Sequence, residues 1–410
     1  MRRTYGTPQR QRMQRNAASG LFTKSSKLQQ TASMKTKPNI FSGSYSPEDV
    51  IFLMKPIAMT PMSLAEKERR IQTGECHYSE MIGEERLPSP EYLAVFKDGC
   101  DRNLHTMALN VIALASIIAE NICGAVSLVS LARAGTPVGA LLKRALTRYF
   151  DRQATHFSIS IIRDRGMDEN ALLYILRKEH CLPESIVFVD GWTGKGVIAR
   201  ELKKAVAVFN AKHGTHLSNQ LYVLSDLCGA AGFSPSWEDY LIPSSILNAT
   251  VSGLVSRSIL NARHIGANDF HGCIYYKEFE KNDLSNWFLN QVSVQMAAEI
   301  AKTDTTGGAK TIVSPALSED IRQGLREKSE IFAQYAKNIH GVKNINHVKP
   351  GIGEATRVLL RRIPDKLLIK DASHPDVRHL IVLAKEKGVP VIEYENLPYR
   401  AAAFIQNLSF

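Results

Sequence analysis

The sequence lacks the cysteine patterns of metal-binding and disulfide-rich proteins. Its 410 residues contain only six cysteines, and no two of them form a Cys-x-x-Cys pair. Scattered cysteines argue against a structural zinc site and against a disulfide scaffold, and they are typical of a reducing compartment. We therefore expect a cytoplasmic protein.

Long hydrophobic runs are also missing. The longest apolar stretch, at residues 107–118, is shorter than the roughly 20 residues that a membrane-spanning helix needs. No apolar stretch follows the early basic residues, which argues against a secretory signal. We expect a buried helix at 107–118 and no membrane partner.

Acidic residues are absent from the first 47 positions. That segment holds nine Lys and Arg residues, so it accounts for most of the net charge of +11. Its polar composition predicts a disordered basic tail over residues 1–40. An organellar presequence or a nucleic-acid-binding arm is the alternative interpretation.

What the sequence does contain is an alternation of short apolar segments with helical patterns. We expect strands at 125–131, 156–162, 186–189 and 221–224, with helices at 138–149, 169–179 and 197–212 between them. This pattern is typical of an α/β domain with a parallel sheet covered on both faces. Ligands of such sheets bind at the carboxyl ends of the strands. Helical patterns before and after it extend this predicted domain over 41–340.

A glycine-rich turn follows the expected strand at 186–189. Its sequence is Asp190-Gly-Trp-Thr193-Gly194-Lys195-Gly196, and a helix comes next. Backbone N–H groups at a helix start hold phosphate, and glycines let the phosphate approach the backbone. Asp190 suits a ribose hydroxyl or a bound magnesium ion. The Walker spacing is absent, and a tight connection without any ligand is the structural alternative.

Two further turns lie at expected strand ends. Arg133-Ala134-Gly135 could present backbone donors and a guanidinium to a diphosphate, or could simply pack a helix. Arg163 and Arg165 could cover a polyanion, or could lie in a solvated loop.

Together these turns resemble the type I phosphoribosyltransferases, although Gly191 stands where that family has a second acid. The resemblance implies a magnesium-dependent transfer that uses phosphoribosyl diphosphate or a related ribonucleotide. It implies catalytic residues Asp190, Arg133, Arg163 and Arg165, with Asp190 also as the magnesium ligand. The implied substrate-binding residues are Ala134, Gly135, Thr193, Gly194, Lys195 and Gly196.

Four segments resemble the StiP family, which is associated with tellurite resistance and stress: Phe41–Asp49, Gln72–Glu80, Asp190–Gly196 and Ile242–Leu254. That family carries both a phosphoribosyltransferase interpretation and a cysteine-protease name. A protease would need a cysteine near a histidine in electropositive surroundings. The candidate nucleophiles are Cys228 and Cys273, together with Cys76 beside His77.

After an expected linker at 341–350, residues 351–410 resemble the Pelota RNA-binding domain, which is L7Ae-like. The residues that would meet RNA are Gly351, Gly353, Glu354, Arg357, Arg361 and Arg362. A plain αβ interaction module is the alternative.

The sequence therefore predicts a parallel-sheet, type I phosphoribosyltransferase-like α/β domain with helical N-terminal and following regions, plus a small αβ L7Ae-like C-terminal domain. The function expected from it is phosphoribosyl transfer in a tellurite- and stress-associated biosynthetic system. The alternatives are a cysteine protease and an RNA-associated protein that senses a nucleotide. The acceptor and the oligomeric state stay open, with a homo-oligomer among the alternatives.

Overall fold

The structure is a computed structural model that describes residues 40–303 and 315–408. The basic tail predicted at 1–40 lies outside the described residues, apart from Ile40. All the elements named below belong to one compact unit of the chain.

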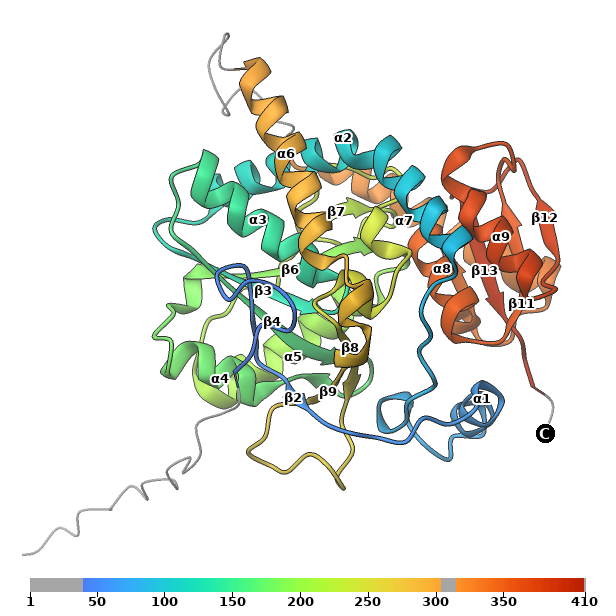
Figure 1. Cartoon of the computed structure of the whole chain (residues 1–410), viewed down its shortest axis with the longest axis horizontal. Helices are drawn as coiled ribbons and strands as arrows, with labels where there is room; N and C mark the ends of the chain where they lie inside the picture. The colour runs from blue at the N-terminus through green and yellow to red at the C-terminus, as the bar shows by residue number, and fades with distance from the viewer. Residues whose placement is uncertain (1–39, 304–314, 409–410) are drawn as a thin grey trace, which may run out of the picture. The chain divides into compact units, whose positions relative to one another are not determined.

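The centre of the fold is a parallel sheet with strand order β1-β4-β3-β6-β7 (Figure 1). Its strands are β1 (Ile51–Phe52), β3 (Val126–Ala132), β4 (Ala154–Ile162), β6 (Ile186–Thr193) and β7 (Leu221–Asp226), and the short β5 (Gly166–Met167) pairs antiparallel with β4. Almost all of β3 is buried, as expected for a parallel strand covered on both faces. The predicted α/β architecture with a parallel sheet is confirmed, while its type I phosphoribosyltransferase description stays a prediction.

Two hydrophobic cores lie on opposite faces of this sheet. Val187 and Val189 of β6 belong to one core, and Ile186 and Phe188 belong to the other, because successive side chains of a strand point to opposite faces. The first core is covered by α2 (Pro90–Asn121), α3 (Gly135–Tyr149) and α6 (Ser285–Thr303), and the second by α4 (Glu169–Arg177) and α5 (Val197–His213).

Helix α2 contains the apolar stretch at 107–118. It is the one described helix that is long and apolar enough to cross a membrane by length and composition. Most of its apolar window is buried inside the protein. Met107, Val111, Leu114 and Ile118 recur at helical spacing and have no exposed surface. The buried helix expected at this position is confirmed.

A second sheet, with order β2-β9-β8, lies in a region where the sequence predicts mainly helix. It consists of β2 (Lys55–Pro56), β9 (Gly272–Tyr275) and β8 (Val255–Ile259). The strands are short, and β2 comes from far away in the sequence, so local patterns do not reveal them. The helices expected further along are found as α6 and α7 (Glu319–His340).

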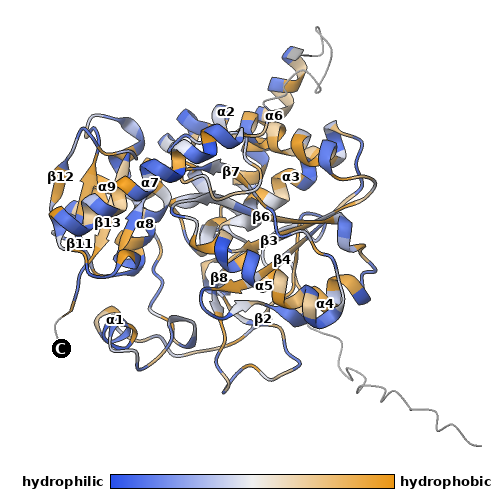
Figure 2. Cartoon of the chain, turned by 180° about the vertical axis from the view of Figure 1, so that it is seen from behind, coloured by the Kyte–Doolittle hydropathy of each residue, from blue (hydrophilic) through white to orange (hydrophobic). Residues whose placement is uncertain are grey.

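The C-terminal module, residues 348–405, is a four-stranded sheet with two helices. Its strand order is β10-β13-β11-β12. Strand β13 pairs antiparallel with β10 and with β11, and β11 pairs parallel with β12. The elements are β10 (Val348–Pro350), α8 (Ile352–Arg361), β11 (Pro364–Ile369), α9 (Arg378–Glu386), β12 (Val391–Glu393) and β13 (Ala401–Ile405). Strand β13 is hydrophobic and fully buried (Figure 2). The segment expected to be a linker, 341–350, supplies β10.

Helix α8 is anchored to the α/β part of the chain. The Asp239 carboxylate accepts hydrogen bonds from the backbone N–H groups of Ile352 (2.9 Å) and Arg400 (2.8 Å). Ile352 and Val358 belong to the same hydrophobic core as α2. The start of α8 therefore lies against the carboxyl ends of the central strands.

Candidate functional site

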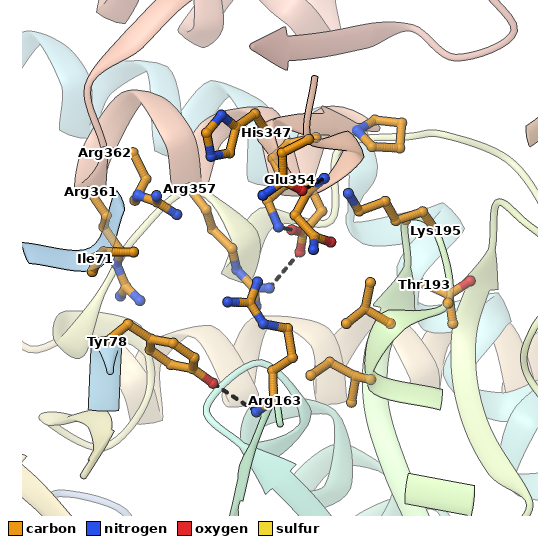
Figure 3. Close-up of a pocket in the computed structure, with 18 of the residues that line it drawn as sticks. Ile71, Tyr78, Arg163, Thr193, Lys195, His347, Glu354, Arg357, Arg361 and Arg362 are labelled. Atoms are coloured by element: carbon orange, nitrogen blue, oxygen red, sulfur yellow. Dashed lines mark hydrogen bonds and ion pairs between the residues drawn. The ribbon is translucent and has the colours of Figure 1, made fainter. Parts of the chain in front are cut away.

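A cleft of about 870 Å³ lies between the β6–α5 turn and the C-terminal module. The wall from the α/β part includes Tyr78, Arg163 and the turn from Asp190 to Ala199, and the opposite wall includes residues of α8. Its lining is dominated by seven basic residues: Arg163, Lys195, Lys343, Lys349, Arg357, Arg361 and Arg362. Figure 3 shows Arg163 and Arg357 pointing into the cleft from opposite walls. We call it the basic cleft.

The β6–α5 turn uses its polar side chains for contacts inside the protein. The Thr193 hydroxyl donates to the buried Asp226 carboxylate. Lys195 Nζ donates to the carbonyl oxygens of Ile345 (2.5 Å) and Val348 (3.0 Å). Burial, and then the neighbouring Lys349, lower the pKa of Lys195 to about 7. The turn therefore holds the C-terminal module as well as lining the cleft.

Glycines in this turn allow close approach of backbone and neighbours. Gly196 has φ +69° at the start of α5, and a Cβ there would lie 2.6 Å from the Ala230 side chain. A Cβ on Gly194 would lie 3.0 Å from the Pro350 carbonyl oxygen and from the Glu354 side chain. Packing thus accounts for both glycines without a ligand.

Asp190 is a partly buried carboxylate within β6, three residues before the end of the strand. Burial raises its pKa to about 6, and the positive charge of Arg357 opposes this shift. The Arg357 guanidinium lies 4.7 Å above the Trp192 ring and donates to Glu354 at 2.6 Å. Ionising Asp190 at neutral pH therefore opposes folding.

We expect Asp190→Asn to stabilise the protein at pH 7. A raised folded-state pKa gives stability that is present below the unfolded pKa and is lost as the pH rises through about 6. The amide escapes this loss and keeps an oxygen for the Gly191 N–H, so the gain is about 2 kcal/mol at pH 7 and vanishes near pH 4. Urea unfolding of both proteins at several pH values measures it. An equal pH dependence for the two proteins would contradict the assignment.

The Arg133 turn does not line the basic cleft. Arg133 donates to the Leu247 carbonyl (3.3 Å) and to Asn248 Oδ1 (3.1 Å). A Cβ on Gly135 would lie 2.4 Å from the Val189 carbonyl oxygen, so this glycine lets α3 approach β6 closely. Ala134 faces Gly191 across the same contact.

The two arginines after β4, Arg163 and Arg165, have different surroundings. Arg163 lines the basic cleft, its backbone N–H donates to the Tyr78 hydroxyl at 2.8 Å, and its guanidinium lies 5.4 Å from the Tyr78 ring centre. Arg165 instead pairs with Glu80 and donates to the Leu260 carbonyl.

The residues expected to meet RNA also divide into two groups. Gly351 and Gly353 pack inside the protein, because a Cβ on them would lie 2.6 Å from Leu227 and 2.5 Å from Trp192. The basic cleft is lined by the other four, Glu354, Arg357, Arg361 and Arg362. Arg362 donates to the buried Glu68 carboxylate at 2.6 and 2.7 Å, which ties α8 to α1 (Leu64–Gln72).

The cysteines differ strongly in their surroundings. Cys273 is fully buried in the first core, and burial raises its pKa far above the usual value. Cys228 is 5% exposed, and burial and Asp226 raise its pKa to about 12. Cys76 is partly exposed, and its backbone N–H donates to the Arg70 carbonyl oxygen at 3.3 Å. Of these three sulfur atoms, that of Cys76 has the surroundings of a reactive thiol.

Sequence reasoning missed several residues that line the basic cleft. Lys343, His347 and Lys349 come from a segment that carries no recognisable motif. The recurrence of basic residues over 343–349 was the available signal, but these residues fall in the segment that the sequence predicts to be a linker.

Among the described residues, no group of three or more His, Cys, Asp or Glu side chains could hold a metal ion. Glu354, the other acidic residue lining the cleft beside Asp190, pairs with Arg357. The magnesium ion expected at Asp190 stays a prediction.

The fold and this site define a mixed α/β protein with a C-terminal module docked over the end of its parallel sheet. A family model described as "Tellurite-like stress resistance cysteine protease StiP" matches residues 43–293, and one described as "PELOTA RNA binding domain" matches residues 327–407. A protein of Acinetobacter baylyi named "Cysteine protease StiP" is 38% identical over 380 residues, which cover 90% of this chain and 95% of the relative. The chain belongs to the StiP family.

These comparisons correct the function expected from the sequence. Both the family description and the relative's name give a cysteine protease, so phosphoribosyl transfer is the wrong main interpretation and the alternative is favoured. The structure gives a physical reason for part of this error. Thr193, Lys195 and Arg133 are engaged in internal hydrogen bonds, whereas the sequence shows only a pattern suited to phosphate.

Proposed function

We propose that this chain is a cysteine protease whose nucleophile is Cys76. The observation that carries the choice of residue is that Cys76 combines partial exposure, a backbone contact with Arg70 and an adjacent histidine. In the sequence, Cys76 lies between Gln72 and Tyr78, which both line the basic cleft. The name of the family and of the relative supports the class of reaction.

His77 supplies the base in this proposal. Its Nδ1 atom lies 2.8 Å from the Ser79 hydroxyl, while its buried Nε2 atom has no hydrogen-bond partner among the described residues. Burial, together with Arg165 and Arg163, lowers the pKa of His77, so the imidazole is neutral at pH 7 and can accept a proton.

The proposed chemistry balances without a cofactor. His77 takes the proton of the Cys76 thiol, and the sulfur attacks the carbonyl carbon of a peptide bond. The C–N bond breaks, the proton passes from His77 to the leaving amine, and a thioester remains. Water then hydrolyses the thioester and restores the thiol. The charge of the basic cleft favours peptides with acidic side chains.

Thiol alkylation tests the class of reaction. We expect purified protein to cleave denatured casein, and iodoacetamide to stop the cleavage as Cys76 becomes modified, which peptide mass spectrometry follows. Modification of exposed Cys123 is the internal control, since it should not track the loss of activity. Cleavage that survives complete alkylation would rule out a cysteine protease.

A second function is favoured by the match to the Pelota model. We propose that the basic cleft also binds RNA, because cations of the α/β part and of the C-terminal module meet there. Contacts of Lys and Arg with phosphates make such binding salt-dependent.

Lys343→Ala tests RNA binding with little risk to folding, because Lys343 is exposed. We expect weaker binding of a single-stranded RNA and a decrease of about 1 in the slope of log K against log salt. Fluorescence anisotropy at several salt concentrations measures both. Lys385→Ala, an exposed change on α9, is the control and should bind as the unmodified protein does. Equal slopes for all three proteins would contradict RNA binding in this cleft.

A further inference from the structure

A second cleft, of about 840 Å³, is lined by groups of which only Arg361 also lines the basic cleft. It lies between the segments 61–67 and 83–92 on one side and residues 246–250, α8 and α9 on the other. Lys67, Arg257 and Arg361 line it together with Asn248 and Glu85. We call it the second cleft.

The buried cations of this cleft are incompletely neutralised. Arg257 Nε is buried and has no hydrogen-bond partner among the described residues. Lys67 makes no side-chain hydrogen bond or ion pair within the described part of the chain. Burial and then Arg257 lower the pKa of Lys67 to about 7, which reflects a cation crowded by other cations.

A single neutral oxygen atom accepts hydrogen bonds from two guanidinium groups at this cleft. Asn248 Oδ1 accepts from Arg361 Nε at 2.9 Å and also from Arg133 at 3.1 Å. An amide oxygen carries no formal charge, so it satisfies the hydrogen bonds without neutralising the two cations.

Among the described residues that line this cleft, Glu85 is the buried carboxylate. It accepts from the Ala249 N–H and the Ser256 hydroxyl, both at 2.8 Å, and lies 3.4 Å from Arg257. Two other acids line the cleft: Glu84 pairs with Arg86 at its exposed rim, and Glu386 is exposed on α9. The buried Glu68 next to Lys67 is paired with Arg362, so four cations, counting Arg133, surround the single carboxylate of Glu85.

The geometry points to a phosphate-binding site formed by Lys67, Arg257 and Arg361 in the second cleft. A phosphate group supplies the missing negative charge and the acceptor oxygens that planar guanidinium groups bind in pairs. The phosphate is either the free ion or part of a phosphomonoester. In the second case Leu247, Leu360 and Leu383 provide an apolar wall for the organic part.

Calorimetric titration of the full chain with inorganic phosphate, and separately with phenyl phosphate, tests this site at constant ionic strength set with chloride. We expect saturable binding, and a Kd about tenfold or more higher in Lys67→Met and Arg257→Met, because each loses a charge-assisted contact. Lys343→Met, an exposed change in the basic cleft, is the matched control and should bind phosphate unchanged. Lys67→Met keeps the test valid if Arg257→Met fails to fold.

Equal affinity for the two compounds identifies free phosphate, and tighter binding of phenyl phosphate identifies a phosphomonoester. Either result supports the site. Absence of saturable binding to the unmodified chain would overturn it. So would a loss of binding in Lys343→Met that Lys67→Met does not share, since the phosphate would then lie in the basic cleft.

Discussion

Cys76→Ser is expected to lower kcat/KM for casein cleavage by at least about a thousandfold. A serine hydroxyl is a far weaker nucleophile than a thiol. Cys76 contributes a partly exposed side chain and a backbone N–H that donates to the Arg70 carbonyl at 3.3 Å, and serine preserves that backbone contact. The loss should therefore appear in kcat while the unfolding temperature stays the same.

Two other cysteines provide matched controls for this change. Cys181 is likewise adjacent to a histidine, His180, but burial raises the pKa of its thiol. Cys181→Ser and Cys123→Ser should cleave casein at the rate of the unmodified protein. If Cys228→Ser abolished activity while Cys76→Ser retained it, the nucleophile proposed here would be wrong although the protease class would stand.

Glu85→Ala is expected to lower the free energy of unfolding by about 3 to 5 kcal/mol, because it leaves buried cations without their shared carboxylate. The Glu85 side chain is 1% exposed, and it lies beside Arg257. Burial alone would raise its pKa, but Arg257, Arg361 and Arg133 hold the pKa of Glu85 below its usual value.

Because the pKa of Glu85 is lowered, the effect of Glu85→Ala on the free energy of unfolding depends on pH. A carboxyl group with a lowered folded-state pKa contributes stability above its unfolded pKa, and this stability is lost as the pH falls through the folded-state value. The difference between the unmodified protein and Glu85→Ala should therefore shrink in acid. Urea unfolding at pH 7 and at lower pH measures it. Glu84→Ala, an exposed neighbour paired only with Arg86, should change stability by less than about 0.5 kcal/mol.

The sequence predicted the fold well where local patterns decide it. The alternation of apolar segments with helices gave the parallel sheet, because buried parallel strands read as short apolar runs. Strand β13 has the sequence Ala-Ala-Ala-Phe-Ile, and alanine has little strand preference, so only its burial between β10 and β11 makes it a strand.

The candidate site was less predictable, since segments distant in the sequence form it. The glycine-rich turn is shorter than expected, because β6 continues through Asp190 to Thr193 and leaves only residues 194–196 before α5. Within it, Lys195 donates to the carbonyl groups of Ile345 and Val348. No pattern within the turn indicates that contact. The choice among Cys76, Cys228 and Cys273 likewise depends on burial, which the sequence does not state for single residues.

Arg361 lines both clefts, so one guanidinium group faces two cavities that could hold different molecules. An anion in either cavity changes the electrostatic potential at the other through this shared side chain. The two affinities are then thermodynamically linked, and the factor by which a first ligand changes the binding of a second must equal the factor in the reverse order. Because α8 carries Arg361, this linkage between the two cavities would depend on a helix of the C-terminal module.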